Sequence, residues 1–171
     1  SYQSCVLLNF FLAGVLSFIM SASAQAETLI LETSKGEIKI SLLSTLAPNH
    51  VSRIKELVQD GYYDGIIFHR VIPGFMAQTG DPTGTGMSGS GQKLDAEFSD
   101  YQYINGTVGM ARTMDPNSAD SQFFICFDGC SHLTGQYTVW GQVEEGMDVV
   151  ESINAGEPPA EPDQIITARL A

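Results

Sequence analysis

Positive charge is scarce in this sequence. Its 171 residues include 8 Lys and Arg against 20 Asp and Glu, so the formal net charge at pH 7 is −12. Proteins that bind nucleic acids rely mainly on Lys and Arg to neutralise phosphates, and an anionic surface repels phosphate backbones and anionic lipids. The composition therefore predicts no nucleic-acid partner. With 43% hydrophobic and 16% charged residues, the chain suits one compact domain with its own core.

Cysteine and histidine are also few, with three residues of each type. Three residues separate Cys126 from Cys130, but a tetrahedral zinc site would need two further ligands at similar spacing, and the histidines are scattered singly. We therefore expect no metal site. Because Cys126 lies in the apolar run FFICF, a buried free thiol is favoured over a disulfide, although an exported protein could form one.

The first 26 residues contain no charged residue. Their apolar run from Val6 to Met20 is short for a membrane-spanning helix, and Ala24-Gln25-Ala26 fits the small-x-small pattern that signal peptidase recognises. We expect residues 1–26 to be a cleaved signal peptide and residues 27–171 to be the mature domain, exported to the periplasm or secreted. An uncleaved membrane anchor is the alternative, which Asn9 and Ser17 within the run disfavour.

The rest of the chain alternates short apolar runs with loops rich in Gly, Asp and Ser, which predicts a barrel or sandwich of short strands. Residues 28–43 predict a β-hairpin, because apolar and polar residues alternate around a Ser-Lys-Gly turn. Residues 48–60 predict an amphipathic helix that begins at Pro48 and ends at Gly61, with His50 on its exposed surface. Further strands are predicted at 66–68, 75–78, 107–110, 123–127, 137–143 and 164–170, and a short helix within 144–156.

Three ordered segments carry a resemblance to a known family. They are FHRVIPGFMAQTGDPTGTG at 68–86, GMARTMDPNSADSQFFI at 109–125 and HLTGQYTVWGQV at 132–143. They resemble the successive signature segments of the cyclophilins, the peptidyl-prolyl cis-trans isomerases, and specifically of the short bacterial exported members. The similarity runs from about Thr28 to the C-terminus. It implies a mainly β fold, a closed eight-stranded antiparallel β-barrel capped by two α-helices, in a monomer that needs no cofactor.

The resemblance also implies the site. Arg70 and Gln78 would be catalytic, and Phe75, Met76, Phe124 and Leu133 would form an apolar pocket for the proline ring. Gln122 would help to orient Arg70 and the peptide, whose backbone would pair with main-chain groups around Arg112. The remaining residues expected to bind substrate are Ala111, Thr113, His132 and Tyr137.

Arginine suits this chemistry. The rotation barrier of an X-Pro amide is about 18–20 kcal/mol, because resonance must be broken. As the bond twists, the prolyl nitrogen becomes pyramidal and gains a lone pair, so a hydrogen-bond donor aimed at it binds the transition state preferentially. Arg70 stays charged and presents several N–H groups in a fixed fork. We therefore expect an isomerase that acts on X-Pro bonds in folding or unfolded proteins.

The pocket rim departs from the commonest pattern of the family. His132 stands where many cyclophilins carry Trp, Tyr137 where they carry His, and Arg112 where they carry Asn. These departures predict weak binding of cyclosporin without loss of isomerisation. Two other functions remain open from the sequence: a chaperone or scaffold that binds proline-containing partners with incidental catalysis, and a barrel that carries a small apolar ligand inside.

Overall fold

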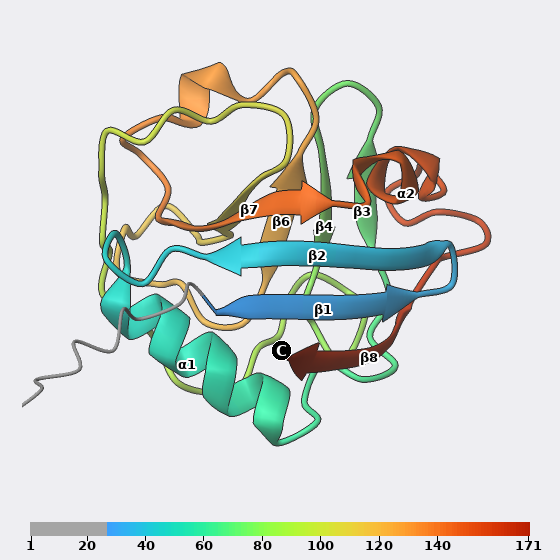
Figure 1. Cartoon of the computed structure of the whole chain (residues 1–171), viewed down its shortest axis with the longest axis horizontal. Helices are drawn as coiled ribbons and strands as arrows, with labels where there is room; N and C mark the ends of the chain where they lie inside the picture. Colours follow the sequence, from blue (N-terminus) through green and yellow to red (C-terminus); the bar gives the residue numbers. More distant parts are fainter. Residues whose placement is uncertain (1–26) are drawn as a thin grey trace, which may run out of the picture.

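The computed structural model describes residues 27–171 and contains eight strands and two α-helices (Figure 1). The strands are β1 (Thr28–Thr33), β2 (Gly36–Leu42), β3 (Arg70–Ile72), β4 (Met76–Thr79), β5 (Thr107–Met110), β6 (Phe123–Cys126), β7 (Val139–Glu145) and β8 (Ile165–Leu170). The helices are α1 (Pro48–Gln59) and α2 (Met147–Ser152), with a 3-10 turn η1 (Ser131–Leu133). Within residues 27–171, no helix combines the length and hydropathy needed to cross a membrane.

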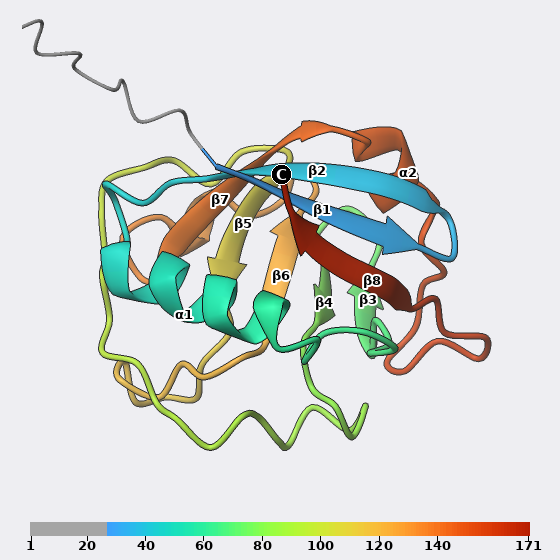
Figure 2. The ribbon, with the colours of Figure 1, turned by 60° about the horizontal axis from the view of Figure 1, so that its bottom comes forward.

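All eight strands belong to one antiparallel sheet, in the order β3-β4-β6-β5-β7-β2-β1-β8. The sheet curls so that its two edges meet, while α1 packs against β8 and α2 against β2 (Figure 2). The mainly β class, the eight antiparallel strands and the two helices are therefore confirmed.

The edges meet through a short segment before β3. Ile67 forms an isolated antiparallel bridge with Gln164, and the amide N–H of Phe68 donates to the carbonyl oxygen of Asp163 at 2.8 Å. The predicted strand at 66–68 is this bridge, and β3 starts two residues later at Arg70. The barrel is thus closed by a few backbone hydrogen bonds and not by a continuous β3–β8 ladder.

Sequence periodicity locates the main elements well. The hairpin predicted at 28–43 is β1–β2, the helix predicted at 48–60 is α1, and the strand predicted at 107–110 is β5 with the same bounds. Alternation also decides which way the side chains point. In β6, Phe123 and Ile125 belong to the barrel interior, whereas Phe124 and Cys126 belong to a second cluster outside it.

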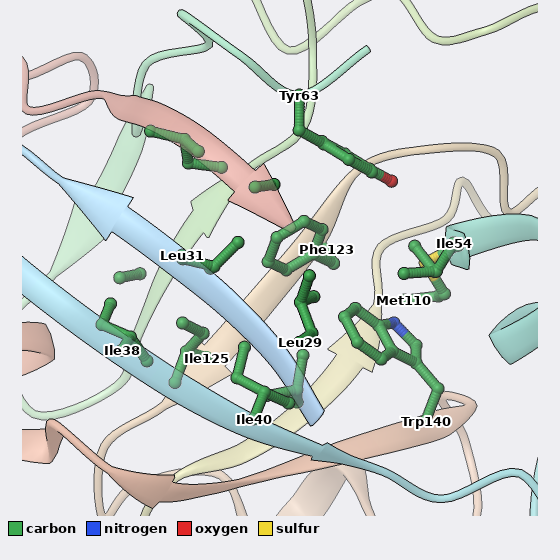
Figure 3. Close-up of a cluster of buried hydrophobic side chains, with 14 of the residues drawn as sticks. Leu29, Leu31, Ile38, Ile40, Ile54, Tyr63, Met110, Phe123, Ile125 and Trp140 are labelled. Atoms are coloured by element: carbon green, nitrogen blue, oxygen red, sulfur yellow. The ribbon is translucent and has the colours of Figure 1, made fainter. Parts of the chain in front are cut away.

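Aromatic and aliphatic side chains fill the barrel interior (Figure 3). The ring of Phe123 lies edge-on to Trp140, with the ring centroids 5.2 Å apart, and also to Tyr63 at 5.4 Å. Leu31, Ile38 and Ile40 from the β1–β2 hairpin are fully buried in the same cluster. Because this interior is packed with the protein's own side chains, the hypothesis of a barrel that carries an apolar ligand inside is wrong.

His50 is not on the helix surface as predicted, because its side chain is completely buried. The segment around residues 94–97 folds over the start of α1, and His50 Nε2 lies 2.8 Å from the carbonyl oxygen of Asp95. The carboxylate of Glu97 accepts a hydrogen bond from the backbone N–H of His50 at 2.8 Å, which satisfies a free donor at the helix start. Burial lowers the pKa of His50 below its ordinary value, against smaller opposite effects of Asp95 and Glu97.

The cysteine prediction is also wrong, because Cys126 and Cys130 form a disulfide. The chain turns back after β6, and the backbone N–H groups of Phe127 and Gly129 donate to the carbonyl oxygens of Phe75 and Gly74. This turn brings the two cysteine Cα atoms to 6.1 Å, a separation that a disulfide can span. Both cysteines are buried in the cluster outside the barrel, so the apolar run FFICF correctly predicted burial but not pairing.

Acidification should destabilise the fold through His50. Its pKa is held below 6.5 in the folded state, so the unfolded chain takes up the proton first, and the free energy of unfolding falls as pH drops below that value. Where only the unfolded state is protonated, each further pH unit removes about 1.4 kcal/mol. Thermal unfolding between about pH 8 and pH 5 measures this slope.

His50→Gln should flatten the slope, whereas the same change at the exposed His132 should not. The buried His69, whose pKa burial also lowers, leaves a residual slope in His50→Gln. A parental slope in His50→Gln would contradict the assignment.

Candidate active site

The site begins with a row of side chains across three neighbouring strands. Arg70 on β3 is directly opposite Gln78 on β4, and Gln78 is opposite Phe124 on β6. Directly opposite residues of an antiparallel pair point to the same face of the sheet, so all three lie outside the barrel. Met76, two residues before Gln78, shares that face and is opposite Cys126.

A pocket of about 160 Å³ lies over this row. Met76, Phe124 and Leu133 are buried within the same outer cluster, and Phe75 and Tyr137 pack against it. Tyr103 supports the pocket from below: its ring stacks on Phe124, and its hydroxyl donates to the carbonyl oxygen of Tyr137 at 2.9 Å. The pocket lining consists of Arg70, Phe75, Met76, Gln78, Ala111, Arg112, Phe124, Leu133 and Tyr137.

A chain of amide hydrogen bonds leads to Arg70. Gln122 Nε2 donates to the carbonyl oxygens of Gly86 and Ser88 at 3.0 and 2.9 Å. Its Oε1 accepts from Gln78 Nε2 at 3.0 Å, and Gln78 Oε1 in turn faces Arg70 Nη1 at 3.5 Å. Because each amide is fixed by the one before it, the oxygen of Gln78 points toward the guanidinium group. The last contact is long, so it orients Arg70 only weakly.

A stronger contact holds Arg70 from the other side. Its Nε donates to Glu157 Oε1 at 2.9 Å, and the two residues are 87 positions apart in the sequence. Sequence reasoning missed Glu157, because it lies in the GEPPAEP connector, where nothing in the local pattern distinguishes it from a solvated acid. The side chains of Arg70 and Glu157 are 43% and 58% exposed, so substrate can reach the guanidinium group.

A second pocket of about 250 Å³ adjoins the first and shares Gln78, Ala111 and Arg112 with it. Thr113 and Gln122 line this second pocket only. His132 lines neither, but its ring stacks on Phe75 with the centroids 5.5 Å apart. The structure therefore brings all twelve predicted site residues to one face, around two adjoining pockets. Residues 27–171 contain no cluster of three His, Cys, Asp or Glu side chains that could hold a metal ion.

Comparison with known proteins identifies the family. The family model "cyclophilin type peptidyl-prolyl cis-trans isomerase/CLD" matches residues 28–170. The chain belongs to the cyclophilin family. A relative in Brucella suis, named "probable peptidyl-prolyl cis-trans isomerase", is 46% identical over 98% of this chain and 95% of its own length. A peptidyl-prolyl cis-trans isomerase of Synechococcus elongatus is 47% identical over 75% of this chain and 89% of its own.

Solved cyclophilin structures share the fold. A cyclophilin from Hirschia baltica superposes with a TM-score of 0.77 at 33% identity, covering 83% of this chain and 73% of its own. A cyclophilin type isomerase of Cryptosporidium parvum, crystallised in the presence of the dipeptide Ala-Pro, gives a TM-score of 0.79 at 30% identity and covers 84% and 98% of the two chains. This cyclophilin is therefore a peptidyl-prolyl cis-trans isomerase.

Proposed function

We propose that Arg70 stabilises the twisted X-Pro amide while the apolar pocket holds the proline ring. The observation that carries this proposal is the guanidinium group at the rim of a pocket lined by Phe75, Met76, Phe124 and Leu133. A proline ring is small and apolar and makes no hydrogen bond from its carbons, so these side chains bind it without polar partners. Because Arg70 lines the same pocket, its guanidinium N–H groups would be near the prolyl nitrogen of a proline bound there.

Two of the three guanidinium nitrogens of Arg70 have a hydrogen-bond partner. Nε donates to Glu157, which holds the plane of the guanidinium group, and Nη1 faces Gln78 at the longer distance of 3.5 Å. Nη2 forms no hydrogen bond within residues 27–171. We assign it the donation to the prolyl nitrogen as the amide twists. The transition state gains this bond and the planar ground state does not, so the bond accelerates rotation.

The substrates are extended X-Pro segments of folding or unfolded client proteins, bound by a monomer. The structure of the Cryptosporidium relative obtained in the presence of the dipeptide Ala-Pro supports this class of ligand. A chaperone or scaffold that only binds proline-containing partners is the alternative. It differs in one observable, because a pure binder does not accelerate cis-trans exchange in a short X-Pro peptide.

Arg70→Ala is expected to lower the isomerisation rate by a factor of roughly 10²–10³, the usual effect of removing one transition-state donor. Arg70→Lys should also be strongly impaired, because Lys keeps the charge but loses the planar fork. Both rates are measured by cis-trans exchange in a short X-Pro peptide. Circular dichroism verifies that each variant is folded, and parental activity in either folded variant would exclude the proposed role.

We further propose that the protein is exported to the periplasm after cleavage behind Ala26. The apolar run and the Ala24-Gln25-Ala26 pattern support this location, and both lie outside the residues that the structure describes. The intact mass of protein recovered from the exported fraction should correspond to a chain that begins at Glu27. Recovery of a full-length, membrane-retained chain would show that the segment is an anchor.

We also propose weak binding of cyclosporin, to which a rim tryptophan contributes in the resembling cyclophilins. His132 occupies that position at the exposed rim and offers less apolar area than an indole. Losing one aromatic contact costs about 1.5–3 kcal/mol, which is a factor of ten to more than a hundred in the dissociation constant.

His132→Trp should therefore tighten cyclosporin markedly, while peptide turnover changes little because the proline ring binds over Phe75 and Met76. Titration of the drug against isomerase activity compares the two proteins. Nanomolar inhibition of the unmodified chain would contradict the argument.

A further inference from the structure

Two basic residues of this acidic protein differ from the other six. All eight Lys and Arg side chains lie within residues 27–171, and six of them pair with a carboxylate. Lys93 and Arg112 form no ion pair in that part of the chain, and residues 1–26 contain no acid. Both unpaired cations line the second pocket, beside the proline pocket.

Arg112 is fixed in place by neutral groups. Its Nε and Nη2 donate to the carbonyl oxygen of Gln136 at 3.1 and 2.8 Å, and its Nη1 donates to that of Thr113 at 2.9 Å. The guanidinium carbon lies 4.5 Å from the ring centroid of Tyr137 and 5.8 Å from that of Phe98. Carbonyls and aromatic faces hold the guanidinium group without neutralising its charge. The group is therefore already ordered in the free protein, and a ligand loses less binding free energy to side-chain entropy.

The acid in the same pocket wall is already hydrogen-bonded. Asp120 Oδ1 accepts from the backbone N–H of Ser90 at 2.8 Å, and its Oδ2 accepts from that of Gly91 at 3.0 Å. The charged side chains of this pocket are therefore Lys93, Arg112 and Asp120, which leaves one net positive charge on a protein of net charge −12. The net charge of the protein disfavours acidic peptides, whereas the net positive charge of this pocket favours a carboxylate.

We infer that the second pocket selects X-Pro segments carrying Asp or Glu close to the proline, with Arg112 and Lys93 as the specificity-determining residues. Arg112 lines both pockets, and an extended chain advances about 3.3 Å per residue, so an acidic side chain within about three residues of the proline reaches it. The selectivity rests on the proposed function, because it assumes that proline occupies the first pocket.

The test compares peptides that differ only by Glu or Gln at one position, taken in turn on each side of the proline. Both kcat/KM for cis-trans exchange and Kd from NMR titration are measured for each peptide. The ratio of the Gln to the Glu dissociation constant is therefore obtained even without turnover. Glu should be favoured over Gln by about threefold to tenfold at one position at low salt. The ratio should approach unity at about 1 M salt, where the screening length is about 3 Å.

Variants assign the preference to the two cations. The ratio should fall in Arg112→Gln and in Lys93→Gln and disappear in the double variant, whereas Lys55→Gln should keep it. Lys55 is the matched control, because it pairs with Glu27 and its loss changes the net charge equally. Since each ratio is internal to one variant, a general loss of activity does not affect it.

The outcomes are distinct. Equal rates and affinities for Glu and Gln peptides overturn the inference and leave the proposed function intact. A Glu preference that survives in the double variant also overturns it. Absence of exchange with every peptide refutes the proposed catalysis, and the ratio of dissociation constants then decides the inference.

Discussion

The antiparallel register of β3, β4 and β6 is the constraint on which the site depends, because it places Arg70, Gln78 and Phe124 in one row. Side chains alternate between the faces, so a slip of one residue would turn Arg70 into the apolar interior. The turn between β3 and β4 fixes this register. Its Gly74 has a φ of 75°, which a type II turn requires at that position, and the backbone N–H of Phe75 donates to the carbonyl oxygen of Ile72 at 3.0 Å.

Because of the same alternation, residues that stabilise the barrel and residues that line the pocket lie on opposite faces of the strands. Residues that point inward from β4 and β6, such as Ala77 and Phe123, join the core that holds the barrel together. Residues that point outward, such as Met76 and Phe124, build the pocket. Both faces of these strands are covered, which explains why β6 is buried at every position. Side chains of the pocket can therefore be substituted without repacking the core.

Sequence reasoning succeeded where a pattern is local and failed where distant segments meet. The hairpin, α1 and β5 follow from alternation, helical spacing and turn residues. The twelve residues that the family resemblance implied for the site lie on one face of the structure, and their roles stay predictions. Burial of His50 depends on a segment about forty-five positions later in the chain, and Glu157 reaches Arg70 only because the barrel closes. The disulfide depends on a turn that two backbone hydrogen bonds tie to residues 74 and 75. A pattern within a short stretch of sequence cannot predict contacts between residues that lie so far apart in the chain.

The ion pair between Arg70 and Glu157 fits the role that we propose for Arg70 better than a stabilising role. Exposed pairs contribute about 0–1 kcal/mol to stability, so this contact adds little to the fold. Its geometry matters more, because a carboxylate on Nε holds the plane of a guanidinium group that lines the pocket. A free arginine at 43% exposure would have to be ordered each time a substrate bound. Glu157 and Gln78 together reduce that ordering cost, Glu157 from outside the pocket lining and Gln78 from within it.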